Sequence, residues 1–288
     1  MTAALRARGL GKRFRRHRAL SDCTLDIPAG RVVGLVGPNG AGKTTLLSLA
    51  AGLLTPTSGT IEVCGGRPAG GPAQLAKVGF VAQDTPAYAR LTVAEHLRLG
   101  ARLNPRWDVR LAADRIQRIG LPPDRRAGDL SGGQRAQLAL TLAIAKRPEL
   151  LILDEPVASL DPLARREFLQ DLSESAGGLS VLHSSHLVSD VERVCDYLVV
   201  LVASRVRVAG EVGELLAGHH LLTGPSTAPI PSGPQVITVH HTDGLTTVLI
   251  RSDARVDADP AWTAGPVCLE DLVLGYMSRS VPALEVQR

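Results

Sequence analysis

Short apolar runs alternate with helical stretches along the chain. The apolar runs are Val32–Val36, Val78–Ala82, Leu150–Leu153, Val181–His183 and Leu198–Val202. Two of them, Leu150–Leu153 and Leu198–Val202, are continuously apolar, which is typical of strands covered on both faces. The pattern therefore predicts an α/β fold with a mostly parallel central sheet.

The middle of the chain has a helical pattern instead. It runs from Leu91 to Ala145, and Thr92 is a suitable residue to begin its first helix. Prolines interrupt the pattern at Asn104-Pro105 and again at Leu121-Pro122-Pro123. We predict a helical insertion over about residues 84–146, placed between two strands of the sheet.

A change in composition marks the last quarter of the chain. The stretch Gly224–Pro234 holds four Pro and two Gly in eleven residues, which is typical of a linker. We predict an N-terminal domain of residues 1–218 and a linker over residues 219–234. Residues 235–288 then form a small α+β appendage, with a hairpin around Asp243-Gly244 and a helix over Leu269–Met277.

Composition narrows the class of protein. The chain has 288 residues, of which 44% are hydrophobic, enough for a large core. The eight aromatic residues (3 Phe, 2 Trp and 3 Tyr) offer few platforms for stacked bases, so we expect no nucleic-acid partner. The four cysteines are scattered and predict neither a zinc site nor a disulfide framework.

Charge and hydropathy point to a cytoplasmic chain. The formal net charge is only +4, and we read the basic cluster Lys12–Arg18 as an exposed turn without a functional role. The longest late apolar stretch, Tyr197–Ala203, is much shorter than the 18 or so residues that cross a bilayer. We therefore expect no membrane span and no secretory signal.

A phosphate-binding motif follows the first apolar run. It consists of Gly37, Pro38, Asn39, Gly40, Ala41, Gly42, Lys43, Thr44 and Thr45. Its glycines let backbone N–H groups converge on a polyphosphate at the start of a helix. Lys43 supplies a charge toward the β- and γ-phosphates, and Thr44 a hydroxyl for Mg²⁺. The alternative is a plain Gly-rich turn.

Two adjacent carboxylates end a later apolar run. Asp154 and Glu155 follow Leu150–Leu153, and successive strand residues point to opposite sides, so the pair serves separate tasks. Asp154 suits Mg²⁺, and Glu155 suits general-base activation of a water. The alternative is an acidic cap before Pro156.

A third motif begins the last helix of the insertion. Its residues Ser131, Gly132, Gly133 and Gln134 form a helix N-terminus that can meet an anion with backbone donors. An ordinary N-cap turn is the alternative. Its position about 20 residues before the acidic strand favours a clamp on a nucleotide that is held by another subunit.

These motifs together resemble the nucleotide-binding subunit of ABC transporters. Residues 37–45 resemble the Walker A loop, 150–154 Walker B, and 130–134 the LSGGQ signature. Single positions also match: the Q-loop glutamine (Gln83), the D-loop aspartate (Asp161), the switch histidine (His186) and the adenine-stacking aromatic (Phe14). The motifs occur in the family's order between about residues 5 and 215.

The resemblance implies a fold and a reaction. The fold is a P-loop nucleotidase core with an antiparallel β subdomain and a helical insertion. ATP and Mg²⁺ are the expected cofactors, with Thr44, Gln83 and Asp154 on the metal side. Two subunits face head to tail and bury ATP, Glu155 activates water, and His186 steadies the γ-phosphate. Asp161 communicates across the dimer.

The resemblance also implies partners. We expect a separate membrane permease, contacted around Asp84–Leu97, which places the chain on the inner face of the cell membrane. A second ATP-binding subunit is expected, most simply another copy. The ending Leu269–Leu272 resembles subunits of drug- and lipid-exporting systems and favours export. The alternatives are a permease-free ABC ATPase that clamps nucleic acid or the ribosome, and a nucleotide-sensing regulator without catalysis.

Overall fold

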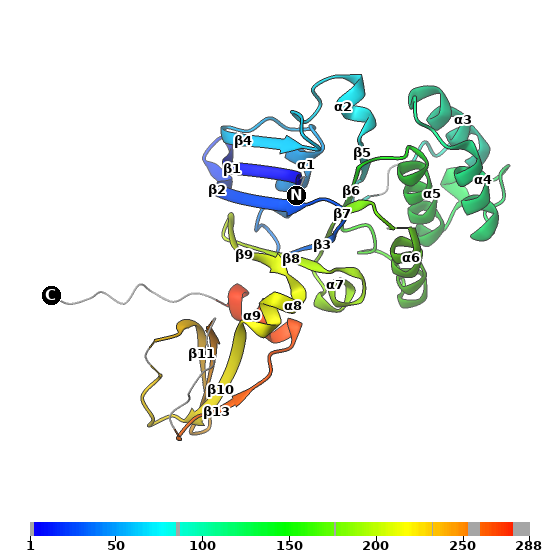
Figure 1. The fold of residues 1–288 in the computed structure, drawn as a ribbon. Helices are drawn as coiled ribbons and strands as arrows, with labels where there is room; N and C mark the ends of the chain where they lie inside the picture. The colour runs from blue at the N-terminus through cyan, green and yellow to red at the C-terminus, as the bar shows by residue number, and fades with distance from the viewer. Residues whose placement is uncertain (1–2, 85–86, 176, 232, 253–259, 279–288) are drawn as a thin grey trace.

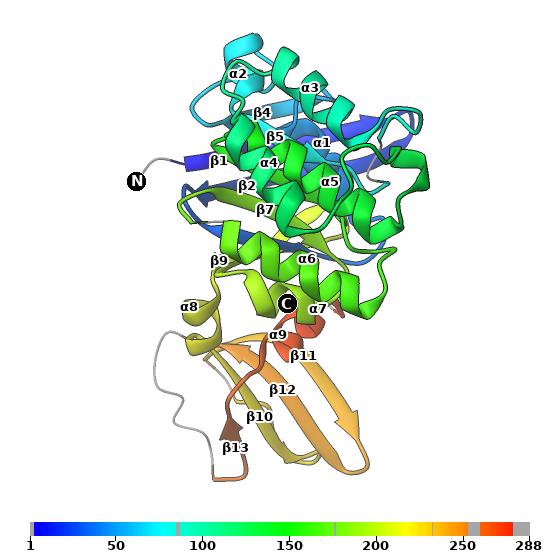
Figure 2. The ribbon, with the colours of Figure 1, turned by 90° about the vertical axis from the view of Figure 1, so that its right-hand side faces the viewer.

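The structure is a computed structural model that describes residues 3–84, 87–175, 177–231, 233–252 and 260–278. Within these residues the strands form three sheets: a mixed central sheet, an antiparallel sheet at the N-terminal side and an antiparallel C-terminal sheet. Figures 1 and 2 show the C-terminal sheet at one end of the molecule, away from the helical insertion. No helix among the described residues combines the length and apolar character needed to span a bilayer.

The central sheet has the strand order β5-β6-β7-β3-β8-β9. Neighbours from β5 to β8 are parallel, and β9 runs antiparallel to β8 at the edge. The bounds are β3 Val32–Val36, β5 Val78–Val81, β6 Leu150–Asp154, β7 Ser180–Ser185, β8 Tyr197–Val202 and β9 Arg205–Glu211. Every residue of β6 and β7 is buried, because other elements of the fold pack on both faces of the sheet. The predicted α/β class and mostly parallel sheet are confirmed.

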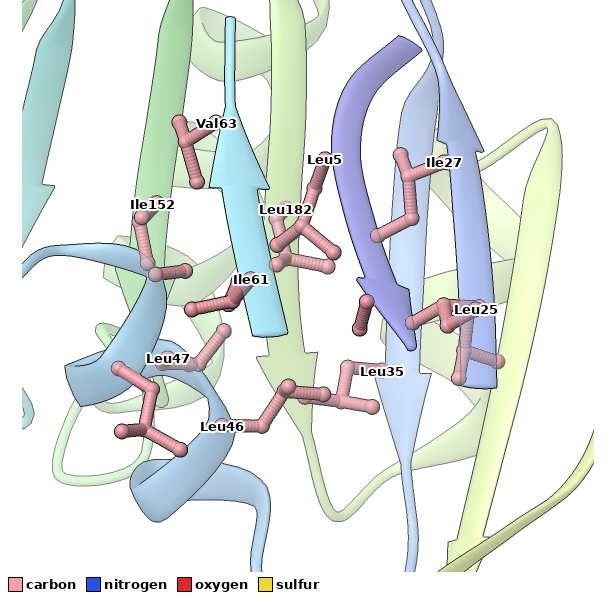
Figure 3. Packing of buried hydrophobic residues seen from close by; sticks show 14 of the residues in the cluster. Leu5, Leu25, Ile27, Leu35, Leu46, Leu47, Ile61, Val63, Ile152 and Leu182 are labelled. Carbon is pink, nitrogen blue, oxygen red and sulfur yellow. The ribbon is translucent and has the colours of Figure 1, made fainter. Parts of the chain in front are cut away.

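The N-terminal antiparallel sheet covers one face of the central sheet. It has the order β2-β1-β4, with β1 Ala3–Phe14, β2 His17–Pro28 and β4 Ser58–Val63. On β2 the buried Cys23, Leu25 and Ile27 alternate with exposed residues, as expected when one face packs and the other meets water. These side chains join helix α1 (Lys43–Ala50) in one apolar cluster with the central sheet (Figure 3).

The helical insertion lies beside β5 and β6 (Figure 1). Its elements are α3 Val93–Leu103, α4 Val109–Arg118, the 3₁₀ turn Ala127–Asp129 and α5 Gly132–Ala145; α2 Pro72–Ala76 precedes β5, and α6 Pro162–Ser175 follows β6. Thr92 caps α3 reciprocally with Glu95, which explains why that helix begins there. The interruptions predicted at the prolines fall between these helices.

The C-terminal region contains more strand than the sequence pattern predicts. Its sheet has the order β11-β12-β10-β13, with α7 and α8 before it and α9 after it. The bounds are α7 Val188–Val194, α8 Val212–Ala217, β10 His219–Pro225, β11 Gln235–Thr242, β12 Leu245–Arg251, β13 Thr263–Gly265 and α9 Leu269–Met277. The predicted hairpin turns at Asp243 and Gly244, both at positive φ.

The linker predicted over residues 219–234 is wrong for its first half. Residues 219–225 form β10, which pairs with β12 along its whole length and with β13 at its centre. The Pro- and Gly-rich composition begins only at Gly224, so it marks the connection to β11 and not the start of the sheet. Pairing with strands far along the chain determines β10.

The C-terminal region shares an apolar core with the central sheet. Leu272 and Val273 of α9 lie in one buried cluster with Val191 of α7 and Val200 of β8. Ile237 and Leu249 from the C-terminal sheet belong to the same cluster. Folding of this region is therefore coupled to folding of the core.

This shared core predicts the effect of a truncated side chain. Leu272 is fully buried, so Leu272→Ala should lower the free energy of unfolding by about 2–5 kcal/mol. Leu274 on the same helix is 52% exposed, and Leu274→Ala should cost about 1 kcal/mol or less. Denaturant unfolding measures both. Equal costs for the two variants would show that α9 does not stabilise the core.

Candidate functional site

The predicted phosphate loop connects β3 to α1. Helix α1 begins at Lys43, whose side chain is only 5% exposed. Its Nζ donates a hydrogen bond to the carbonyl oxygen of Gly37 at 2.8 Å, closing the loop on itself. Gly42 has φ 106°, and a Cβ there would lie 2.3 Å from the carbonyl oxygen of Ala19. This position requires glycine, both for its backbone conformation and for its close neighbour.

Asp154, at the end of β6, is almost completely buried. Its Oδ1 accepts hydrogen bonds from the hydroxyls of Ser184, at 2.9 Å, and Thr44, at 3.3 Å. Burial raises the pKa of the Asp154 carboxyl, while these two hydrogen bonds lower it. The pKa of the Asp154 carboxyl is raised overall, because burial is the larger of these effects.

Glu155 lies between two basic side chains. Its Oε1 is 3.3 Å from Lys43 Nζ, and its Oε2 is 3.4 Å from His186 Nδ1. The backbone of Glu155 is in the left-handed region, with φ 45°. The structure thus brings together three side chains from distant parts of the sequence.

One cavity of about 660 Å³ collects most of the predicted site. It is lined by Phe14, His17, Ala19, Pro38, Asn39, Gly40, Ala41, Gly42, Lys43, Thr44, Thr45, Gln83, Glu155, Ala158 and His186. Its volume is within the usual range for small-molecule sites. Backbone donors, an ammonium group and a helix N-terminus line one side, so the cavity suits a polyphosphate.

The donors near Asp154 fit a hard divalent cation. Thr44 Oγ1 lies 3.3 Å from Asp154 Oδ1, so one hydroxyl and one carboxylate oxygen can face the same ion. Oxygen ligands of this kind, completed by water and phosphate, suit Mg²⁺. Gln83 is exposed and lines the same cavity as Thr44. The described residues hold no cluster of three His, Cys, Asp or Glu side chains for a metal.

The Ser-Gly-Gly motif lies elsewhere. Ser131 caps α5: its Oγ accepts the N–H of Gln134 at 3.2 Å, and its own N–H donates to Gln134 Oε1 at 3.0 Å. Ser131, Gly133 and Gln134 line a separate cavity of about 490 Å³, together with residues of α4 and α6. Among the described residues, none lines both cavities. A single copy therefore does not present both motifs to one ligand.

Two other predicted residues have local partners. Asp161 Oδ1 accepts the N–H groups of Leu163 and Ala164, each at 3.0 Å, so Asp161 caps the start of α6. Phe14 lines the first cavity and is 42% exposed, with Lys12 Nζ 5.1 Å from its ring centroid. In the predicted permease contact Asp84–Leu97, residues 85 and 86 lie outside the described residues.

Sequence reasoning missed three residues of the first cavity: His17, Ala19 and Ala158. The basic cluster that we read as an exposed turn is the tip of the β1–β2 hairpin, where Phe14 pairs with His17. Phe14 and His17 flank the two-residue turn Arg15-Arg16. Arg-Arg is not one of the Gly- or Asn-containing dipeptides that signal a two-residue hairpin, so no local signal placed His17 beside Phe14.

Comparisons with known proteins agree with this geometry. A family model described as ABC transporter matches residues 20–158. The chain is 36% identical over 211 residues to the uncharacterized ABC transporter ATP-binding protein YxlF of Bacillus subtilis, covering 72% of this chain and 70% of that protein. It is also 36% identical over 224 residues to the Nod factor export ATP-binding protein I of Cupriavidus metallidurans, covering 75% and 74%.

A relative named for import and a solved structure extend the comparison. The molybdenum import ATP-binding protein ModC of Rhodobacter capsulatus is 36% identical over 241 residues, covering 80% of this chain and 66% of that protein. A solved ATP-binding subunit of an ABC transporter superposes with a TM-score of 0.68 at 29% identity, covering 74% of this chain and 92% of the other.

The loop geometry predicts different costs for two glycine substitutions. Gly40 has φ 79°, but a methyl group added to its Cα would have no atom within 4 Å. Gly40→Ala should therefore cost about 1–2 kcal/mol from backbone strain alone. Gly42→Ala adds a clash with a backbone carbonyl and should cost more. Denaturant unfolding of both variants tests the ranking. A smaller loss for Gly42→Ala would contradict the packing of the loop against Ala19.

Proposed function

The chain belongs to the ABC transporter ATP-binding family and is an ATPase, and we propose that two copies face head to tail with ATP between them. The phosphate loop of one copy and the Ser-Gly-Gly motif of the other would contact the same nucleotide. The observation that supports this most is the separation of the two motifs into different cavities of one chain. We assign ATP binding to residues 1–218.

The first cavity supplies the nucleotide contacts in this proposal. The backbone N–H groups of residues 37–45, which Pro38 alone lacks, bind the phosphates together with the buried Lys43, and Phe14 stacks on the adenine. Thr44, Asp154 and Gln83 would hold Mg²⁺, which when bound neutralises charge on the β- and γ-phosphates. The 3.3 Å contact between the Thr44 hydroxyl and Asp154 supports this donor set.

Glu155 acts as the general base in our proposal. Its carboxylate is paired with Lys43 and His186. A triphosphate carries more negative charge than one carboxylate, so it attracts Lys43 toward itself and leaves Glu155 free to accept a proton from water. His186 then steadies the γ-phosphate. Binding of ATP and exposure of the base are thereby coupled.

Closure of the dimer follows from differential affinity. Ser131 Oγ uses a lone pair for its capping bond, so its hydroxyl hydrogen remains available to donate to a γ-phosphate. Together with backbone donors at Gly133, Ser131 of the partner subunit reaches the nucleotide only in the closed pair. Because the γ-phosphate contacts favour that state alone, ATP shifts the population toward it and hydrolysis reverses the shift. Asp161, at the start of α6, communicates between the sites.

Transport requires membrane helices from a separate permease. We propose that the permease docks near Asp84–Leu97, beside Gln83, and that this contact keeps the chain at the inner face of the membrane. Export is the favoured direction because Leu269–Leu272 resembles the endings of exporter subunits, and the relative from Cupriavidus metallidurans is named for export. The cargo would then be chosen by the permease.

Removing the general base should trap the closed pair. Glu155→Gln keeps the size of the side chain but removes its basic carboxylate, so ATP hydrolysis should fall by about 100-fold or more while ATP still binds. Gel filtration with ATP should show a dimer for this variant and mainly monomer without nucleotide. Wild-type turnover by Glu155→Gln would refute the assignment of the base.

The permease partnership has its own test. When the chain is mixed with membrane vesicles that contain the permease encoded beside its gene, it should sediment with them, and the vesicles should stimulate its ATPase activity. Vesicles without the permease are the control. ATP-driven uptake of the transported cargo into inverted vesicles would indicate export. Equal sedimentation with both kinds of vesicle would argue against a permease partner.

A further inference from the structure

We propose that Ser184 is a positioning residue for ATP hydrolysis, which fixes the Asp154 carboxylate and the Glu155 backbone through one hydroxyl group. This inference rests on the proposed roles of Asp154 and Glu155. Ser184 lies two residues before His186, at the carboxyl end of β7, and its side chain is completely buried. Two hydrogen bonds of this side chain support the proposal.

The hydroxyl of Ser184 donates on one side and accepts on the other. Asp154 and Ser184 are direct partners in the parallel register of β6 and β7. Ser184 Oγ is 2.9 Å from Asp154 Oδ1 and 3.4 Å from the carbonyl oxygen of Leu153, so its single hydrogen goes to the closer, charged acceptor. The same oxygen accepts the backbone N–H of Glu155 at 2.9 Å.

The second of these bonds stabilises a strained backbone. Glu155 has φ 45°, a conformation that costs a residue with a Cβ roughly 1–2 kcal/mol. Because Ser184 accepts the Glu155 N–H, it fixes the orientation of the peptide between Asp154 and Glu155. The turn that this peptide begins carries the Glu155 carboxylate to within 3.3 Å of Lys43 and 3.4 Å of His186.

The adjacent serine does not duplicate this role. Successive strand residues point to opposite faces, and Ser185 is directed to α7. Its Oγ donates to Asp190 Oδ2 at 3.0 Å and accepts the N–H of Leu187 at 3.0 Å. Ser185 thus shapes the chain around His186, whereas Ser184 shapes the two carboxylates.

Ser184→Ala removes one oxygen and tests the proposal. It leaves Asp154 Oδ1 with the longer Thr44 contact among the described residues, and leaves the Glu155 N–H without its hydroxyl acceptor. Groups that orient metal ligands typically contribute 10- to 100-fold, so kcat at saturating Mg²⁺ should fall by about that factor. The KM for ATP should change by less than about threefold, because the loop contacts remain.

Three further measurements separate positioning from general destabilisation. Nucleotide binding without Mg²⁺ should be unchanged in Ser184→Ala, while the Mg²⁺ concentration that gives half-maximal tightening of binding should rise about tenfold. Ser184→Thr keeps the hydroxyl and should recover most of kcat. Thermal unfolding of the full chain shows that each variant is folded.

Ser180 provides the matched control on the same strand. It is also buried, and its Oγ accepts the N–H of Gly30 at 2.9 Å, but it lies about 13 Å from Ser184 at the other end of β7. Ser180→Ala should lower stability to a similar extent and leave kcat within about twofold of wild type.

The outcomes distinguish this inference from the proposed function. The positioning role is overturned if Ser184→Ala keeps wild-type kcat and Mg²⁺ response, if Ser180→Ala loses as much kcat, or if folded Ser184→Thr recovers none. Glu155→Gln is measured in parallel. If Glu155→Gln abolishes turnover and Ser184→Ala does not, the inference about Ser184 fails alone; if Glu155→Gln hydrolyses ATP normally, the proposed function fails first.

Discussion

Parallel pairing of β3, β7 and β6 is the constraint on which the site depends. In this pairing Val36 lies opposite Ser185, and Asp154 lies opposite Ser184. The phosphate loop, the two carboxylates and the segment before His186 therefore leave the sheet at the same edge. Parallel strands have their carboxyl ends together, so ligands of open α/β sheets bind at this edge.

Burial makes the charges at this edge depend on each other. Lys43 and Asp154 are both nearly inaccessible to water, and an unpaired charge there would be costly. Lys43 is compensated by Glu155 and by a backbone carbonyl, and Asp154 by two hydroxyl donors. In the proposed function, a bound triphosphate would change these partners, which would give ATP a direct electrostatic effect on the proposed base.

The helical insertion places the hydrogen-bond donors of the Ser-Gly-Gly motif away from this edge of the central sheet. Helix α5 presents Ser131 beside α6, whose first turn is capped by Asp161.

The C-terminal sheet packs with α7, α9 and β8 in one continuous apolar cluster. It is therefore an extension of the core and not a loosely attached tail. Figure 2 shows this extension below α6 and α7.

The sequence by itself determined the elements whose signals are local. Strands β3, β6 and β8, the hairpin of β11 and β12, and helix α9 follow from apolar runs, a turn dipeptide and a helical period. The phosphate loop around Lys43 and the acidic pair Asp154 and Glu155 were also predicted from the sequence, because their residue types and spacing are those that phosphate and Mg²⁺ binding require. Local patterns of this kind survive folding when packing agrees with them.

Only the tertiary structure decided which of these residues meet. Ser184 reaches Asp154 because a parallel register aligns two strands 30 residues apart, and no spacing rule encodes that register. His17 joins the cavity through a hairpin, and residues 219–225 become a strand because distant partners complete their hydrogen bonds. Such contacts depend on packing between segments that are far apart in the sequence. A local sequence pattern carries no information about that packing, so it could not predict them.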